Sequence, residues 1–189
     1  MSRYGQVEPL SRDHETGEFD CGSNTQTTWL RRHGLQAHQS DTSKVYVVCL
    51  AGSQRVVGCY ALAAGSVGHE SVSPRISKGL GRYPIPVILL TRLGVDVHEQ
   101  GKGLGSGLVR DALLQTASIA DRVGVRALLI HAETPTAAEF YRRIDPGFQP
   151  SPTDALHLVL RLKDLRAAIR EAASRPDMGT KSLRGGGCG

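Results

Sequence analysis

The sequence predicts one α/β domain with a mixed sheet. A chain of 189 residues is long enough to bury a sizeable core and too short for two domains of ordinary size. Its hydrophobic content is 40% but its aromatic content only 5%, so aliphatic side chains must form most of the core. Apolar runs typical of strands are interspersed along the chain with runs that have helical spacing. Together these observations indicate a globular α/β chain.

The first predicted element is an amphipathic helix over residues 25–37. Trp29, Leu30 and Leu35 give this helix an apolar side, and the basic residues among them give it an exposed side. Residues 20–24 precede it with the residue types of a turn and a helix cap.

A β-hairpin and a long loop are predicted next. Residues 45–50 and 55–64 are rich in β-forming residues, and the turn residues 51–54 separate them. Residues 65–86 are polar and rich in Gly, Ser and Pro, which predicts a long surface loop.

The middle of the chain predicts a strand over 87–97, a glycine-rich loop and a helix over 104–123. Apolar residues recur along this helix at steps of three and four, which predicts one buried face. The residues of that face are Leu108, Val109, Ala112, Leu113, Thr116, Ile119, Ala120 and Val123.

The last third predicts two strands and two helices, in the order strand 126–131, helix 135–144, strand 156–162 and helix 163–173. Residues 1–173 therefore make up the predicted domain. Residues 174–189 are Gly-rich and polar, and we expect them to form a disordered tail.

Charge and cysteine content limit the possible functions. The formal net charge of +5 favours an anionic partner, and either RNA or the phosphates of CoA would satisfy it. The cysteines lie apart, without a CxxC pair or a histidine at metal-ligand spacing, so we expect free thiols and no metal site. They are Cys21, Cys49, Cys59 and Cys188. With no secretory signal and no apolar run near the ~20 residues of a membrane span, we expect a cytoplasmic protein without membrane contact.

The strongest functional pattern is Gln100-Gly101-Lys102-Gly103-Leu104-Gly105-Ser106, between a predicted strand and a predicted helix. Its glycines allow a tight turn whose N–H groups converge on an anion, and the helix N-terminus adds partial positive charge. The pattern predicts a pyrophosphate site. A P-loop is excluded because Lys102 precedes Gly103, and the mid-chain position and glycine spacing disfavour a dinucleotide site. A plain strand-to-helix connection is the alternative without function.

These residues resemble the signature of the GNAT superfamily of N-acetyltransferases. In that signature Gln or Arg is followed by two residues, Gly, one residue, and Gly or Ala, and Gln100, Gly103 and Gly105 fill it. The resemblance implies a GNAT fold, with a mixed, mostly antiparallel sheet, a splayed strand pair and flanking helices. It also implies acetyl-CoA as acetyl donor, held in part by the backbone N–H groups of Val95 and Val97. The implied acetyl-CoA contacts are Leu93, Val95, Val97, Gln100, Gly101, Lys102, Gly103, Leu104, Gly105, Ser106 and Phe140.

Tyr141 is the predicted catalytic residue. A phenol with a pKa of about 10 stays protonated at neutral pH and can give its proton to a departing thiolate. In GNAT enzymes a Tyr of this helix often has that role. The alternative is that Phe140 and Tyr141 only pack the core.

No general base is evident, because residues 84–94 of the predicted strand contain no Asp or Glu. This absence favours an α-amine with a pKa of about 8 over a lysine amine at about 10.4, since the α-amine loses its proton more readily. The remaining candidates for a base are Asp96, His98, Glu99, His131 and Glu133.

Several segments between residues 10 and 165 resemble the toxin branch of the GNAT enzymes, the TacT and AtaT type. These segments are 19–22, 29–32, 35–37, 83–87, 92–96, 100–105, 140–141 and 150–152. The resemblance implies acetylation of the α-amine of aminoacyl-tRNA, neutralisation by a ribbon-helix-helix antitoxin, and a homodimer. It departs from the usual pattern at Asp145-Pro146, which lengthens the turn after Tyr141, and at Gly94, where Ala is commoner.

Basic residues are the predicted RNA contacts, because Lys and Arg bind phosphates in a salt-dependent manner. They are Arg31, Arg32, Lys78, Arg82 and Arg92. Two alternative functions stay open. One is a GNAT enzyme for a small amine, a peptide N-terminus or a protein lysine, and the other is a CoA-bound module whose work is to bind a partner.

Overall fold

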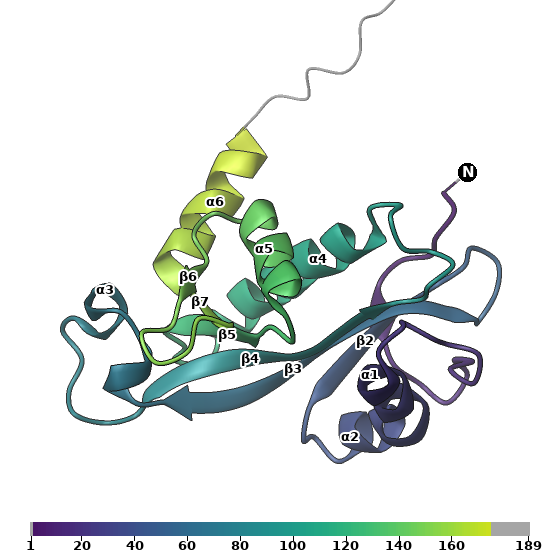
Figure 1. Ribbon diagram of the computed structural model, residues 1–189, viewed down its shortest axis with the longest axis horizontal. Helices are drawn as coiled ribbons and strands as arrows, with labels where there is room; N and C mark the ends of the chain where they lie inside the picture. The colour runs from purple at the N-terminus through teal and green to yellow at the C-terminus, as the bar shows by residue number, and fades with distance from the viewer. Residues whose placement is uncertain (1, 175–189) are drawn as a thin grey trace, which may run out of the picture.

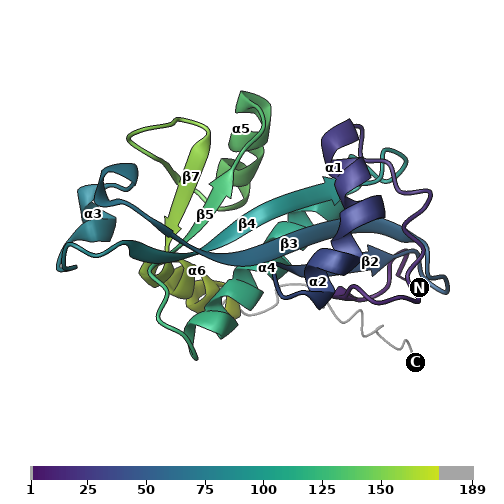
Figure 2. The ribbon, with the colours of Figure 1, turned by 90° about the horizontal axis from the view of Figure 1, so that it is seen from below.

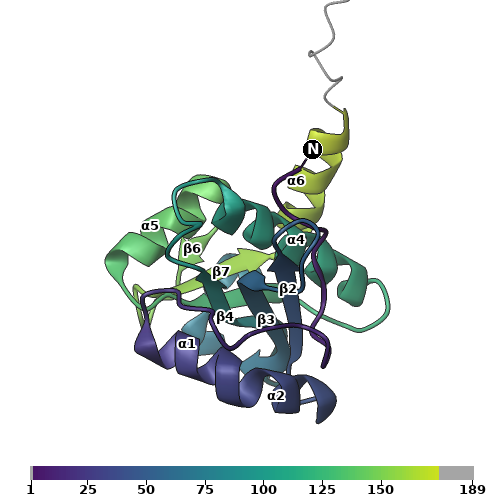
Figure 3. The ribbon, with the colours of Figure 1, turned by 90° about the vertical axis from the view of Figure 1, so that its right-hand side faces the viewer.

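The computed structural model describes residues 2–174 and contains one seven-stranded sheet with helices on both faces (Figures 1 and 3). Met1 and residues 175–189, with Cys188 and the predicted tail, lie outside the described residues. The elements in chain order are β1 (Glu8–Pro9), α1 (Asn24–Trp29), a π-helical segment (Leu30–Gly34), α2 (Leu35–Gln39), β2 (Lys44–Cys49), β3 (Val56–Val67), a 3₁₀-helix (His69–Ser71), α3 (Pro74–Ser77), β4 (Ile85–Val95), α4 (Leu104–Ala120), β5 (Ala127–His131), α5 (Pro135–Ile144), β6 (Gln149–Pro150), β7 (His157–Arg161) and α6 (Leu162–Ser174).

The strand order is β1-β2-β3-β4-β5-β7-β6, and every neighbouring pair is antiparallel except β4 and β5. β3 and β4 pair over residues 58–67 and 85–95, whereas β5 pairs with β4 only over Val87–Leu90. Beyond Leu90 the two parallel strands separate. The predicted mixed, mostly antiparallel sheet with a splayed strand pair is therefore confirmed.

A β-bulge marks the point where the strands separate. Ala61 of β3 lies opposite Arg92, and Leu62 lies opposite Leu90, so Thr91 is an extra residue on β4. A bulge of this kind bends a strand and increases its twist. It redirects the last residues of β4 away from β5 and toward the start of α4.

Helices α4, α5 and α6 cover one face of the sheet, and α1 and α2 cover the other (Figure 3). Leu108 of α4 and Leu165 of α6 are fully buried against strand residues such as Leu128. On the opposite face Phe19 and Leu30 pack in a second cluster. Full burial of each aliphatic side chain contributes about 2 kcal/mol, so these two layers hold the strands in register.

The helix predicted over 25–37 is confirmed, but its middle is the π-helical segment, which apolar spacing does not reveal. The hairpin and the later strands and helices are confirmed within a few residues. The loop predicted over 65–86 is wrong in part. β3 continues to Val67, and a 3₁₀-helix and α3 follow because Val72 and Ile76 pack into a third apolar cluster.

The predicted buried face of α4 is wrong at Val123. The helix ends at Ala120, and the Val123 side chain lies 60% exposed in the turn that follows. The strands β1 and β6 have two residues each, too few for a sequence pattern to predict them.

Cys21, Cys49 and Cys59 are free thiols, as predicted. Cys49 and Cys59 are buried, and burial raises the pKa of the Cys59 thiol to about 12, which removes it from thiolate chemistry near neutral pH. Among residues 2–174 the structure contains no helix long and apolar enough to cross a membrane.

Candidate acetyl transfer site

The loop between β4 and α4 has the geometry of an anion site. Gly101 and Gly103 have φ angles of 74° and 84°, a region that side-chain-bearing residues rarely adopt. Gly103 is also the N-cap of α4 and caps it without a side-chain hydrogen bond. The amide of Gly107 donates to the carbonyl of Gly103 (3.1 Å), so the three amides ahead of it have no partner within the helix. These are positioned to bind a phosphate oxygen.

Side chains of the loop hold it in place rather than point at a ligand. The Gln100 Nε2 donates to the carbonyls of Val95 and Cys21, both at 3.0 Å. The Lys102 Nζ donates to the His98 carbonyl (2.6 Å) and to the Glu99 carboxylate (3.1 Å). The loop therefore offers mainly its backbone to a ligand.

Glu99 joins this loop to the N-terminus. Its buried carboxylate accepts hydrogen bonds from Arg3 Nε (2.8 Å) and Nη2 (2.7 Å) and from the Tyr4 hydroxyl (2.8 Å). These hydrogen bonds, with that of Lys102, lower the pKa of Glu99 well below its usual range. Glu99 is thus a structural anion and a poor candidate for a base.

At the end of β4, every second backbone amide faces the gap between β4 and β5. The Asp96 amide donates to the Val57 carbonyl of the neighbouring chain segment (2.9 Å). Because amides along a strand point alternately to its two sides, those of Leu93 and Val95 point away from β3 and toward the side that β5 has left. The Val97 amide instead donates to the Asp20 carbonyl (2.7 Å), so it is not free for a thioester carbonyl. This removes the backbone role predicted for Val97.

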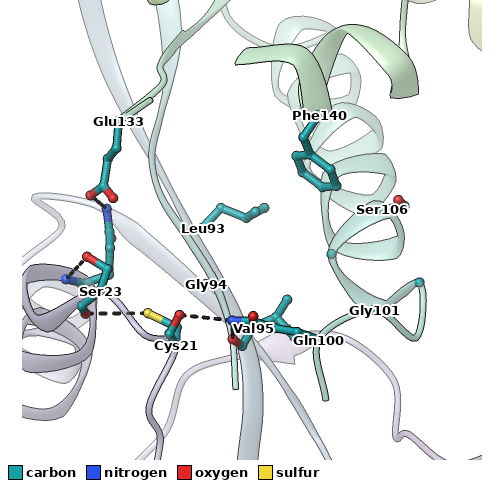
Figure 4. Close-up of a pocket in the computed structure, with 13 residues that line it drawn as sticks. Cys21, Ser23, Leu93, Gly94, Val95, Gln100, Gly101, Ser106, Glu133 and Phe140 are labelled. Carbon is teal, nitrogen blue, oxygen red and sulfur yellow. Dashed lines mark hydrogen bonds between the residues drawn. The ribbon is translucent and has the colours of Figure 1, made fainter. Parts of the chain in front are cut away.

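A cavity of about 470 Å³ lies between β4, the glycine loop and α5. Figure 4 shows Phe140 and Ser106 on one side of it and Glu133 and Ser23 on the other, with Leu93 between them. The cavity is within the usual size range for small-molecule sites, roughly 300 to 1,000 Å³. It is lined by Cys21, Ser23, Gln26, Leu93, Gly94, Val95, Gln100, Gly101, Gly103, Gly105, Ser106, Glu133 and Phe140.

Most residues predicted to contact acetyl-CoA meet at this cavity. The exceptions are Val97, Lys102 and Leu104, which do not line it. Lys102 is tied to Glu99, and Leu104 packs on the main core. One end of this open space lies beside amides that have no partner within α4, and the other lies beside α5, the helix that carries the buried Tyr141. Such a space fits a long ligand with a diphosphate, as acetyl-CoA is.

Two further cavities continue from the first into the gap between β4 and β5. A small one of about 80 Å³ shares Leu93, Gln26 and Glu133 with it and is also lined by Tyr141. A third, of about 320 Å³, shares Thr91, Arg92 and His131 with the small one and reaches Leu129 on the α3 side of the sheet. The splay therefore connects the loop side of the site to the opposite face.

Tyr141 both packs in the core and lines the small cavity. It is 7% exposed, and its ring lies edge-on to that of Phe140, with centroids 5.3 Å apart. Burial and then the charge of Glu133 raise the pKa of Tyr141 above its ordinary value. Its hydroxyl is therefore protonated at neutral pH, the form that an acid catalyst requires.

The chain is similar to a curated protein of Mycobacterium tuberculosis (strain ATCC 25618 / H37Rv), named as a tRNA-acetylating toxin. The two are 44% identical over 169 residues, which cover 89% of this chain and 99% of the relative. The chain belongs to the family of tRNA-acetylating toxins. This family is of GNAT type, so the GNAT fold predicted from the loop motif and the toxin branch predicted from the eight matching segments are both confirmed. No protein-family model matches the chain.

Solved structures of the toxin AtaT have the same fold. AtaT complexed with acetyl-methionyl-tRNAfMet has a TM-score of 0.79 at 25% identity, covering 87% of this chain and 98% of that one. AtaTR bound with acetyl-CoA has a TM-score of 0.75 at 25% identity, covering 89% and 99%. An AtaT–AtaR complex bound to DNA has a TM-score of 0.70 at 25% identity, covering 87% and 99%.

The basic residues predicted to contact RNA divide into two groups in this toxin-family chain. Arg92 lies at the splay, with its guanidinium 5.2 Å from the centre of the Trp29 ring, and Arg31 and Arg32 are exposed in the π-helical segment after α1. Lys78 and Arg82 are exposed after α3, at the far end of the long β3–β4 pair (Figures 1 and 2). The structure does not bring the five together.

The residues near the N-terminus that line the site were not predicted from the sequence. Cys21, Ser23 and Gln26 line the main cavity, although they lie more than sixty residues before the glycine loop. Gly94 also lines it, and a Cβ there would lie 3.2 Å from the Phe19 ring and 3.3 Å from Cys21. The sequence around Cys21, Ser23 and Gln26 predicts a turn and a helix cap, but no residue pattern in that segment indicates a ligand.

Proposed function

We propose that this chain transfers the acetyl group of acetyl-CoA to the α-amine of aminoacyl-tRNA and so blocks translation. The observation that carries the proposal is the connected set of cavities. It joins α4 amides that have no partner within the helix, a buried phenol and an opening on the opposite face of the sheet. The proposal agrees with the family, because the M. tuberculosis relative is a tRNA-acetylating toxin.

The donor side consists of backbone groups. The amides of residues 103–106 bind the diphosphate of acetyl-CoA, and the Leu93 and Val95 amides receive the pantetheine arm. Fixed amides near the thioester carbonyl stabilise negative charge on its oxygen in the transition state. Phe140 closes the side of the cavity opposite Glu133.

Tyr141 is the proton donor to the CoA sulfur in this proposal. It lines the small cavity where the splay connects the two faces, and its buried hydroxyl is held neutral. A positioned acid of this kind contributes typically about 10²- to 10⁴-fold to the rate.

The acceptor side suits an amine at the end of a nucleic acid. It opens beside Arg92 and beside α1, which leads into the exposed Arg31 and Arg32. The absence of Asp and Glu from β4 favours an acceptor that loses its proton easily, as an ester-linked α-amine does. Lysine is disfavoured because its amine is about two pKa units more basic.

We further propose that a ribbon-helix-helix antitoxin neutralises the chain, that two copies form a homodimer, and that it acts in the cytoplasm. Support comes from the toxin family and from the related AtaT–AtaR complex. Sedimentation should give twice the chain mass of 20.3 kDa. Co-expression with a short protein from the neighbouring reading frame should restore growth. Sedimentation at the chain mass would refute the dimer.

The central experiment supplies the purified chain with labelled acetyl-CoA and, in separate reactions, charged tRNA, deacylated tRNA, small amines and lysine-rich protein. Label should appear only in the charged tRNA and should leave the RNA with the amino acid on mild base hydrolysis. Label confined to small amines or lysines would identify a different acetyltransferase. Binding of acetyl-CoA with no label in any acceptor would instead indicate a partner-binding module.

A further inference from the structure

Gln26 and Glu133 form a bridge across the site. The Gln26 Nε2 on α1 donates to the Glu133 Oε1, just after β5, at 2.6 Å. Among residues 2–174 these two alone line all three connected cavities. Figure 4 shows the Glu133 carboxylate directed toward α1, across the cavity from Phe140. The bridge therefore lies where the donor side and the acceptor side of the site meet.

We propose that Glu133 binds the α-ammonium group of the acceptor and accepts the protons that its nitrogen loses. This inference rests on the proposed function and deepens it. A carboxylate is absent from β4, but one reaches the splay from the end of β5 instead. An ammonium group supplies the hydrogen-bond donors that Gln26 supplies now, so the acceptor takes over a position for which Glu133 is already oriented.

The proposed step balances in protons and bonds. The acceptor nitrogen bonds to the acetyl carbon, and the bond from that carbon to sulfur breaks. An ammonium nitrogen loses two protons on becoming an amide. Glu133 passes the first to solvent before attack and accepts the second during it. The sulfur takes the hydroxyl proton of Tyr141, and the proton on Glu133 then passes to the Tyr141 phenolate, which restores both residues.

The position of Glu133 also couples the two proton transfers. Burial and then the negative charge of Glu133 raise the pKa of Tyr141, so the phenol is protonated before the reaction. Once Glu133 accepts a proton from the nitrogen, that charge disappears and the phenol becomes a stronger acid. Tyr141 thus gains acidity at the moment when the thiolate leaves.

Other ionisable groups facing these cavities are less suited to this role. His131 of β5 lines the second and third cavities but not the first, and its ring stacks on His157 at 3.9 Å. Arg92 of β4 is a cation and repels an ammonium group. Cys21, before α1, lines only the first cavity. Glu133 is the carboxylate that all three cavities share.

The test compares Glu133→Gln with the wild-type chain across pH 6 to 8.5, using charged tRNA and saturating acetyl-CoA. Both chains react through the neutral amine, so their kcat/KM values should rise together with pH, but the variant lacks the acceptor for the second proton. We expect its kcat/KM to be about 100-fold low at every pH. Calorimetric binding of acetyl-CoA should be unchanged. Glu133→Asp keeps a carboxylate and should recover most of the lost rate, whereas a Glu133→Asp chain as slow as Glu133→Gln would overturn the inference.

A second measurement needs no turnover. Without acetyl-CoA, the wild-type chain should bind charged tRNA more tightly than the same tRNA after deacylation, and Glu133→Gln should lose that preference. Glu139→Gln is the matched control, because Glu139 is exposed on α5 and pairs with Arg142 outside these cavities. If the wild-type chain acetylates charged tRNA but Glu133→Gln behaves like Glu139→Gln, the inference fails and the proposed function stands. If the wild-type chain acetylates no charged tRNA, the proposed function itself fails.

Discussion

The proposed donor side and the proposed acceptor side of the site are built in different ways. The donor side uses backbone amides from one stretch of chain, the end of β4 and the loop that starts α4. The acceptor side uses side chains from several separate segments, with Gln26 on α1, Arg92 on β4 and Glu133 after β5. Changes on the donor side should therefore act through backbone conformation and cofactor affinity. Changes on the acceptor side should act through side-chain chemistry and turnover.

The largest effect should follow from a change of backbone conformation on the donor side. Gly103 has a φ of 84°, and a residue with a side chain costs roughly 1–2 kcal/mol in that conformation. Gly103→Val should force the turn open and misplace the amides. We expect acetyl-CoA affinity, measured by calorimetry, to fall at least 100-fold because a network of charge-assisted hydrogen bonds is lost.

Gly107→Val is the control for this prediction. Gly107 lies one turn into α4 and does not line the cavity, and a Cβ at this position would meet nothing within 4 Å. This variant should bind acetyl-CoA as the wild-type chain does. Equal affinity of Gly103→Val and Gly107→Val would contradict the assignment of the loop to the diphosphate.

Tyr141→Phe should have the next largest effect, and on turnover rather than affinity. The ring packing against Phe140 and Phe148 is kept, whereas the proton donor is lost. We expect kcat to fall about 100-fold with little change in acetyl-CoA binding. Tyr46→Phe is a suitable control, because within the described residues the Tyr46 hydroxyl makes no hydrogen bond and its ring stacks on Tyr60. Unchanged kcat in Tyr141→Phe would leave Tyr141 with a packing role alone.

The same contrast explains what the sequence could predict. The glycine loop, the strand before it and the helix after it are contiguous, and their residue types specify both local conformation and anion binding. The sequence therefore predicted most residues of this stretch that line the main cavity. The exceptions are Val97, whose amide is taken by the distant Asp20, and Lys102 and Leu104, which do not line it. Glu133 ranked only among several candidate bases, because its importance comes from the splay and from Gln26, 107 residues away in the chain. The loop prediction over 65–86 is wrong in part because Val72 and Ile76 are isolated in a polar stretch and are buried by tertiary contacts.

A smaller effect should separate the two groups of basic residues. Arg31 and Arg32 follow α1, which carries Gln26 into the acceptor cavity, whereas Lys78 and Arg82 lie at the far end of the sheet. The double variant Arg31→Glu and Arg32→Glu should raise KM for charged tRNA roughly tenfold. The slope of log KM against log salt concentration should fall by about 0.7–0.9 for each lost phosphate contact. The double variant Lys78→Glu and Arg82→Glu is the matched comparison. A larger KM effect from the latter pair would place the RNA body over α3 instead.

The smallest effect should appear on acidification and should be confined to the donor side. Hydrogen bonds from Arg3, Tyr4 and Lys102 lower the pKa of Glu99, so its ionised form stabilises the folded state. That stabilisation is complete above the ordinary carboxyl pKa of about 4.3 and is lost as the pH falls below it toward the lowered value. Between pH 5 and pH 3 the melting temperature of the wild-type chain should therefore fall more than that of Glu99→Gln. The variant should have the lower melting temperature at pH 5, but it has no carboxyl group at position 99 to titrate. Parallel curves for the two would mean that the link from Arg3 through Glu99 to Lys102 does not hold the glycine loop in solution.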